Sequence, residues 1–178
     1  ATTEIYTLSL HDALPIFYKE MRVLIKLMFV CHGNICRSTM AEFVMKDLVR
    51  KAGLADKFII NSSATSREEI GCDTHYGTKA KLREMNIPFS KRKAVQITKQ
   101  DYDMYDYIIV MDNNNLRNLS YIIGEDTEHK VYKMMSFIGE NRDVKDPWYT
   151  DNFDETYEDI DKACRALLAK LIKEYNLA

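Results

Sequence analysis

The chain has 178 residues, of which 46% are hydrophobic and 29% charged, and this composition suits one packed domain and argues against disorder. Its 25 Lys and Arg and 27 Asp and Glu leave a net charge of −2, which disfavours a nucleic-acid binder with a basic surface. No apolar run reaches the roughly 20 residues that span a bilayer, so we expect a cytoplasmic protein whose four cysteines are free, catalytic or metal-bound.

Residues 1–20 are expected to lie outside the folded domain. The segment lacks the features of a signal peptide, because Glu4 is its first charge and because His11 and Asp12 interrupt its apolar residues. It resembles the translation of a sequencing adapter fused to a gene model. We therefore predict that it is a non-native or disordered extension and that residues 21–178 form a single domain.

From residue 21 onward, strand patterns alternate with helix patterns. In chain order the sequence predicts a strand at 23–30, a helix at 40–52, a strand at 58–60, a helix at 74–85, a strand at 107–111, a short helix ending at 119, a strand at 131–134 and a helix at 154–175. This alternation is typical of an α/β protein in which helices cover both faces of a parallel sheet. The active site of such a fold lies at the carboxyl ends of the strands.

Residues 31–38 (CHGNICRS) connect the first buried strand to the first helix. Gly33 and Asn34 are residue types that tolerate positive φ, so the loop can curl with successive backbone N–H groups pointing inward. Such a nest, continued by a helix N-terminus, binds a tetrahedral dianion. Arg37 adds a fork of donors that can hold two phosphate oxygens at once.

Cys31 begins this loop and is expected at the bottom of an electropositive bowl, which favours its thiolate form. A thiolate beneath a bound phosphoryl group is positioned for in-line attack at phosphorus. Ser38, which we predict as the helix N-cap, can donate its hydroxyl to that sulfur. The alternative interpretation is an ordinary strand-to-helix turn, since a Cys followed six residues later by an Arg is common by chance.

Residues 30–42 (VCHGNICRSTMAE) resemble the phosphate-binding loop of the low-molecular-weight protein tyrosine phosphatases, with Thr39 in place of the usual Pro. The similarity extends from residue 29 to about residue 171. It implies a three-layer α/β/α sandwich with a four-stranded parallel sheet, and hydrolysis of phosphotyrosine monoesters without a metal ion or other cofactor. By this resemblance the phosphate-binding residues are His32, Gly33, Asn34, Ile35, Cys36, Arg37 and Ser38.

Asp146 is the predicted proton donor, because a phenolate leaves faster when it is protonated. The family places its general acid in a late Asp-Pro turn, although such a dipeptide is also a common structural turn. Trp148 and Tyr149 follow it and are expected to form walls for an aryl ring, with core packing as the alternative. Glu68 stands where many relatives have an aromatic residue, and a carboxylate there would favour substrates with basic residues beside the phosphotyrosine.

Cys36 is predicted to be a redox-resolving cysteine that traps an oxidised Cys31, a role that the family resemblance supports. The alternative is a small buried residue behind the loop. Asp112 fits either a brace for the active site or a helix N-cap, and His75 fits a structural role better than a functional one. No Cys and His set has zinc spacing, so we predict no metal site.

Three other functions remain open. Protein arginine phosphatases share this loop but carry Thr at the position of Ile35. Thioredoxin-coupled arsenate reductases need two further cysteines close together, whereas Cys72 and Cys164 are far apart in the sequence. A non-catalytic phosphoprotein-binding module would need neither nucleophile nor acid. We therefore expect phosphotyrosine-containing proteins as partners, no nucleic acid or membrane, and a monomer or weak dimer.

Overall fold

A computed structural model describes residues 24–177, so the prediction for residues 1–20 lies outside the described part of the chain. Its centre is a sheet of parallel strands in the order β2-β1-β3-β4. The strands are β1 (Ile25–Cys31), β2 (Phe58–Ala64), β3 (Tyr107–Val110) and β4 (Val131–Lys133). The predicted four-stranded parallel sheet is therefore confirmed.

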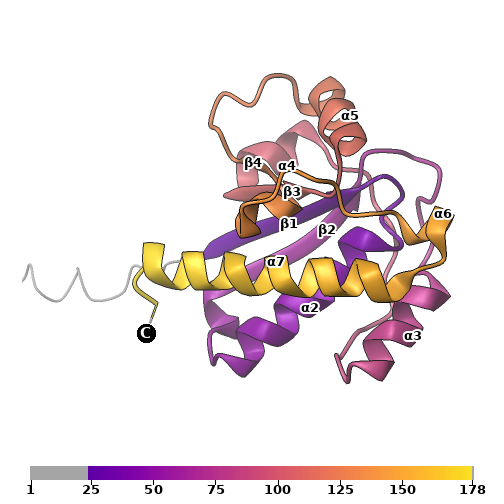
Figure 1. The fold of residues 1–178 in the computed structure, drawn as a ribbon. Coiled ribbons are helices and arrows are strands. Elements are labelled where there is room, and N and C mark those ends of the chain that lie inside the picture. Colours follow the sequence, from indigo (N-terminus) through magenta and orange to yellow (C-terminus); the bar gives the residue numbers. More distant parts are fainter. Residues whose placement is uncertain (1–23, 178) are drawn as a thin grey trace, which may run out of the picture.

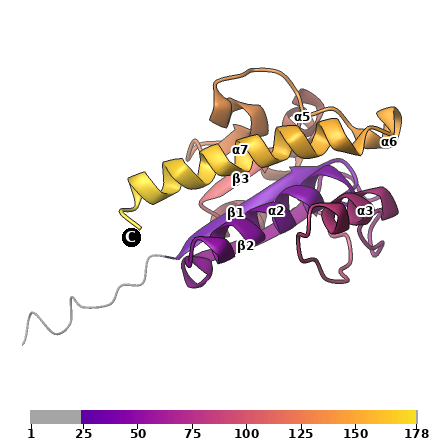
Figure 2. The same ribbon diagram turned by 60° about the horizontal axis from the view of Figure 1, so that its bottom comes forward.

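Helices cover both faces of this sheet (Figures 1 and 2). On one face lie α2 (Arg37–Lys51), α3 (Tyr76–Glu84) and α7 (Phe153–Glu174), and on the other lie α4 (Lys99–Met104) and α5 (Asn113–Ile123). The shorter elements are the 3-10 turns η1 (Ala55–Lys57) and η2 (Met134–Ile138) and the helix α6 (Pro147–Thr150). The arrangement is the expected three-layer α/β/α sandwich.

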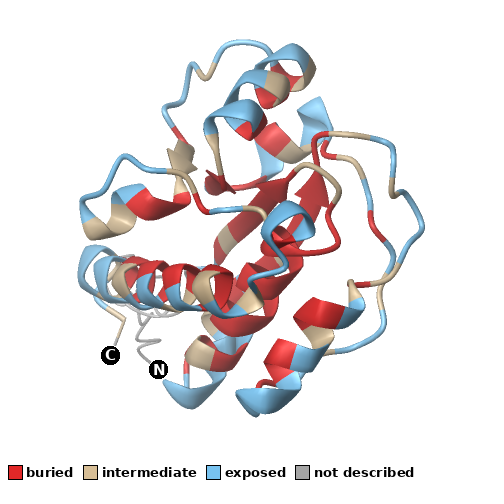
Figure 3. Cartoon of the chain, turned by 45° about the vertical axis from the view of Figure 1, so that its right-hand side comes forward, coloured by how far each residue is buried: buried red, intermediate tan, exposed pale blue. Residues whose placement is uncertain are grey.

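The apolar residues of β1 explain why both faces need a cover. Successive side chains of a strand point to opposite faces of the sheet. Leu27 and Phe29 accordingly pack into the core beneath α2 and α7, whereas Met28 and Val30 pack into the smaller core beneath α4 and α5. Figure 3 shows this burial along the central strands and the inward sides of the helices.

Two elements are longer than the sequence patterns predicted. β2 continues through a polar stretch to Ala64, because residues 61–63 pair with residues 28–30 of β1 and the side chains of Asn61 and Ser62 find hydrogen-bond partners inside the fold. α5 continues to Ile123 and stops at Gly124, whose φ of +81° ends the helix. The sequence pattern predicted too short a helix because residues 120–121, near the end of α5, are polar.

The parallel topology brings the carboxyl ends of all four strands to one edge. Cys31 is the last residue of β1, and Asp112 comes two residues after β3 ends. The segment that follows β4 and η2 carries Asp146 to the same edge, where it begins α6. The sheet therefore gathers at one edge three residues that are 115 positions apart from first to last (146 − 31).

Candidate active site

A cleft of about 590 Å³ opens at this edge, with Cys31 in its lining. Of the residues predicted as catalytic or phosphate-binding, the structure places all but Asn34 and Ser38 along this cleft, and both of those are buried behind it. Glu68, Trp148 and Tyr149 also line the cleft. The structure thus brings together the predicted nucleophile Cys31, Arg37, the Asp146 carboxylate and the aromatic side chains.

The hydroxyl of Ser38 lies against the sulfur of Cys31, with 3.0 Å between Oγ and Sγ. Ser38 is the second residue of α2, and the N-cap is Cys36, so the prediction of Ser38 as the cap is wrong. The helix begins early enough that the Ser38 side chain turns into the loop. Because Ser38 Oγ accepts a hydrogen bond from Asn34 Nδ2 at 2.9 Å, its own hydrogen is available to the sulfur.

Asn34 holds the curl of the loop with a φ of +58°, in the left-handed region. Gly33 does not adopt a positive φ, so the loop uses the tolerance for this conformation only at Asn34. What Gly33 provides is space, because an added Cβ would lie 3.1 Å from Cγ of Glu69. The loop thus needs one left-handed residue and one residue without a side chain.

Arg37 is 2% exposed, and its guanidinium joins two carboxylates at the floor of the cleft. Nη1 donates to Asp112 Oδ2 at 2.6 Å and to the Val144 carbonyl at 3.0 Å, and Nη2 donates to Asp146 Oδ2 at 2.7 Å. Burial by itself lowers the pKa of Arg37, but the charges of Cys31, Asp146 and Asp112 outweigh it and leave that pKa raised. Arg37 is therefore a permanent positive charge in the cleft.

Asp112 fulfils both roles that the sequence left open. One carboxylate oxygen braces Arg37, while the other accepts from the Asn115 N–H at 2.6 Å and caps α5. His75 takes the structural role, since its Nδ1 accepts from the Gly77 N–H at 3.1 Å at the start of α3. His75 also stacks on Phe153, which fixes its ring.

Asp146 begins α6, where its Oδ1 accepts from the Trp148 N–H at 3.1 Å. Its other oxygen faces Arg37, so the carboxyl group is held at the cleft from two sides. Trp148 and Tyr149 are 57% and 84% exposed, which places them at the mouth of the cleft and excludes core packing. Across the mouth, Glu68 Oε2 lies 2.9 Å from His32 Nε2.

Comparisons with known proteins agree with this geometry. Residues 26–177 match the family model described as low molecular weight phosphotyrosine protein phosphatase. The chain belongs to this family. The low molecular weight protein-tyrosine-phosphatase YfkJ of Bacillus subtilis is 38% identical over 156 residues, which are 86% of this chain and all of that protein.

Solved structures of family members share the fold. The crystal structure of YfkJ superposes with a TM-score of 0.82 over 85% of this chain and 96% of that one. A low molecular weight protein tyrosine phosphatase from Streptococcus pyogenes is 42% identical, with a TM-score of 0.76 over 85% of this chain and 97% of that one. A Drosophila arginine phosphatase is 28% identical, with a TM-score of 0.75 over 82% of this chain and 97% of that one.

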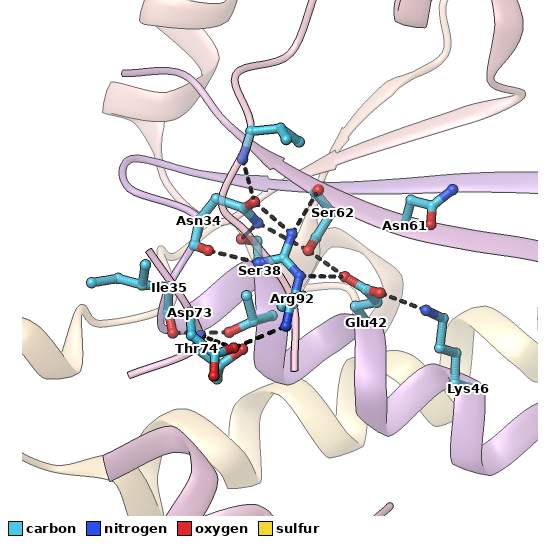
Figure 4. A network of polar contacts seen from close by, with 12 residues as sticks. Asn34, Ile35, Ser38, Glu42, Lys46, Asn61, Ser62, Asp73, Thr74 and Arg92 are labelled. Atoms are coloured by element: carbon cyan, nitrogen blue, oxygen red, sulfur yellow. Dashed lines mark hydrogen bonds and ion pairs between the residues drawn. The ribbon is translucent and has the colours of Figure 1, made fainter. Parts of the chain in front are cut away.

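Sequence reasoning missed Arg92, which this family member places directly behind the loop (Figure 4). Its Nη1 donates to the Asn34 carbonyl at 2.9 Å, and its Nη2 donates to Asn34 Oδ1 at 2.7 Å and to the Ser62 carbonyl at 3.3 Å. Glu42 Oε2 accepts from Ser62 Oγ at 2.5 Å and lies 3.7 Å from Arg92 Nε. Arg92 thus holds both the backbone carbonyl and the side-chain amide of Asn34, and this amide in turn orients the Ser38 hydroxyl.

We predict that Arg92→Met lowers kcat about tenfold, since the lost hydrogen bonds of a charged donor are worth about 1.5–3 kcal/mol. The Ser38 hydroxyl would lose its orientation, so alkylation of Cys31 by iodoacetate should also slow at fixed pH. Arg92→Lys should restore part of both rates. Arg165→Met, which removes a surface guanidinium paired with Asp161, is the control. A lower Tm with kcat and alkylation unchanged would reduce Arg92 to a structural role.

Cys36 is buried within the loop, and burial raises the pKa of its thiol to about 12, with the charges of Cys31 and Asp146 adding to the effect. Cys31, Cys36, Cys72 and Cys164 are all free thiols in the structure. The resolving role of Cys36 stays a prediction. The thiolate of Cys36 is the species that reacts to give a disulfide, and it should become more abundant as pH rises toward 12.

After brief peroxide treatment followed by thiol reductant, wild type should regain activity and Cys36→Ser should not. Peptide mass should show a Cys31–Cys36 link in the wild-type protein only. Because Cys36 must deprotonate first, formation of the link should accelerate with rising pH. Equal recovery of the two proteins would leave Cys36 with a packing role alone.

Proposed function

We propose that this chain hydrolyses phosphotyrosine monoesters in proteins through a phosphocysteine intermediate on Cys31, without a metal ion or other cofactor. The observation that carries the proposal is Arg37 Nε, a buried donor with no acceptor among the described residues. Buried donors are nearly always satisfied. A phosphoryl oxygen bound above Cys31 would satisfy this one, and the inward-facing loop would hold the other oxygens.

In the first step the Cys31 thiolate attacks phosphorus, the S–P bond forms and the bond between phosphorus and the aryl oxygen breaks. Asp146, protonated at this stage, gives its proton to the departing phenolate oxygen. The Ser38 hydroxyl donates a hydrogen bond that stabilises the Cys31 thiolate. Arg37 neutralises the charge on the phosphoryl oxygens throughout.

In the second step a water molecule attacks the phosphocysteine. Asp146, now a carboxylate, takes the proton of that water, the S–P bond breaks, and inorganic phosphate and the Cys31 thiolate are released. The same carboxyl group therefore acts as acid and then as base. The contact between Asp146 and Arg37 supports this assignment, because it holds the carboxyl group at the edge of the phosphate position.

The surroundings of this site define the other parts of the proposal. Trp148 and Tyr149 would contact the aryl ring of the substrate, and Glu68 would contact residues beside it. The described residues include no helix that could span a membrane. We place the protein in the cytoplasm as a monomer or weak dimer, with phosphotyrosine-containing proteins as its partners.

Cys31→Ser tests the nucleophile. The variant should lose hydrolysis of phenyl phosphate by at least about 1000-fold, because serine lacks a thiolate at neutral pH. It should still bind vanadate, since Arg37 and the loop amides remain. Wild-type hydrolysis should be the same with and without EDTA. Turnover by the variant near the wild-type rate would remove Cys31 from the mechanism.

Asp146→Asn tests the acid through the leaving group. Loss of general acid catalysis should slow phenyl phosphate about 100-fold or more, and should slow nitrophenyl phosphate much less, because its phenolate needs little protonation. The comparison is made as the ratio of kcat/KM values for the two substrates. A ratio equal to that of wild type would exclude Asp146 as the proton donor.

Phosphoarginine is the second candidate substrate, because an arginine phosphatase is among the structural relatives. Ile35 is 8% exposed and lines the cleft, so its apolar side chain borders the phosphoryl position and favours the tyrosine ester.

An arsenate reductase needs two further cysteines close together. Cys72 is on the exposed surface while Cys164 is buried in α7, which is unfavourable for such a relay between thiols.

Replacing Ile35 by the Thr of the arginine phosphatases should shift the ratio of phosphoarginine to phosphotyrosine hydrolysis upward by up to about tenfold, because one hydrogen bond contributes about 0.5–1.5 kcal/mol. Ile35→Val, which keeps an apolar β-branched side chain, is the matched control. If both variants keep the wild-type ratio, position 35 does not determine the substrate.

A further inference from the structure

The order of the strands determines which charges flank Cys31. Because the sheet runs β2-β1-β3-β4, the segment after β2 and the segments after β3 and β4 leave the sheet on opposite sides of β1. Of the latter, α6 returns toward the segment after β2, where the rings of Trp148 and His75 lie 5.7 Å apart. Glu68 and Glu69 belong to the segment after β2. Arg117 on α5 and Lys145 before α6 belong to the opposite side, and all four residues line the cleft.

The acidic side carries negative charge that the protein leaves largely uncompensated. The Glu68 side chain is 71% exposed, and its one contact with a basic group is to His32. Glu69 has no basic side chain within ion-pair distance among the described residues, and its carboxylate raises the pKa of the Cys72 thiol. Arg67 is adjacent in the chain but is not part of the cleft lining.

On the opposite side, the carboxylates that line the cleft are already engaged by basic groups other than Arg117 and Lys145. The carboxylates of Asp112 and Asp146 are both paired with Arg37, and that of Asp143 is 2.7 Å from Lys133. Arg117 is exposed and donates only to the side chain of Asn114, at 3.1 Å.

Lys145 is 62% exposed and lies 2.8 Å from Glu155, a surface pair that contributes little and that a ligand can replace. Arg117 and Lys145 therefore offer their positive charge to the mouth of the cleft.

From this arrangement we infer that the mouth recognises a phosphotyrosine segment with opposite charges on its two flanks. The basic flank faces Glu68 and Glu69, and the acidic flank faces Arg117 and Lys145. Trp148 and Tyr149 lie exposed at the same mouth and contact the phosphotyrosine ring between the flanks. This inference rests on the proposed function, because it needs the phosphoryl group to be bound above Cys31.

Four phosphotyrosine peptides of equal length test it: Lys before and Glu after the phosphotyrosine, the reverse order, Lys on both flanks and Glu on both flanks. One of the two mixed peptides should exceed the other in kcat/KM by about tenfold, as expected for a few exposed charge pairs. The uniform peptides should lie between them, since each gains on one side and loses on the other. The spread should shrink in 0.5 M NaCl because salt screens exposed charges.

Charge reversals identify the two sides. In the double variant Glu68→Lys and Glu69→Lys, the peptide with Glu on both flanks should become the best substrate. In the double variant Arg117→Glu and Lys145→Glu, the peptide with Lys on both flanks should become the best. The ranking is read within each variant, so a general loss of activity does not affect it. The surface controls Glu125→Lys and Lys162→Glu should keep the wild-type ranking.

Phenyl phosphate, which has no flanks, separates the two proposals. If wild type hydrolyses it but the two mixed peptides react equally, or a uniform peptide is best, the charge inference is overturned and the proposed function stands. A ranking that the reversals fail to change would also overturn the inference. If wild type hydrolyses neither phenyl phosphate nor any peptide, the proposed function fails, and the inference fails with it.

Discussion

The buried guanidinium of Arg37 is the constraint on which the rest of the site depends. A buried charge is costly unless it is paired and hydrogen-bonded, and removal of one partner destabilises a protein by several kcal/mol. Arg37 obtains its partners from the segment after β3, through Asp112, and from the segment after β4, through Val144 and Asp146. The strands must therefore end together for the charge to be tolerated, and the same contacts place the proposed acid beside the nucleophile.

A second guanidinium stabilises the loop from behind. Arg37 faces the cleft, whereas Arg92 contacts the outer side of the same loop through Asn34. The left-handed backbone of Asn34 is unfavourable for most residues. Here hydrogen bonds to the side chain from Arg92 and from the Val95 N–H compensate for it, and the Asn34 amide itself donates to Ser38. The geometry around Cys31 thus depends on residues about 60 positions away in the sequence.

Much of the fold could be predicted because its signals are local. The apolar run in β1 and the periodic pattern of α7 predict their elements, and residues 31–38 predict an anion site between a strand and a helix. The polar end of β2 was missed because its Ser and Asn residues resemble a turn until their partners are known. Ser38 was misplaced as a cap because the pattern does not show that the helix begins at Arg37.

Other features of the site had no local signal. Arg92 stands in a basic segment that resembles a solvated surface, and only the tertiary structure shows that it contacts Asn34 and Ser62. The two charged sides of the cleft depend on the strand order, which the sequence does not specify. Asp112 was compatible with two roles, and the structure shows that its two oxygens serve one each.

The most direct test of the mechanism is to detect the phosphoryl enzyme. Wild-type protein mixed with excess phosphotyrosine peptide and quenched in acid during turnover should carry one phosphoryl group, and peptide mass should locate it on Cys31. The phosphoryl group should be absent when Cys31 is replaced by Ser. A turning-over enzyme that carries no phosphoryl group, or carries it on another residue, would contradict the account.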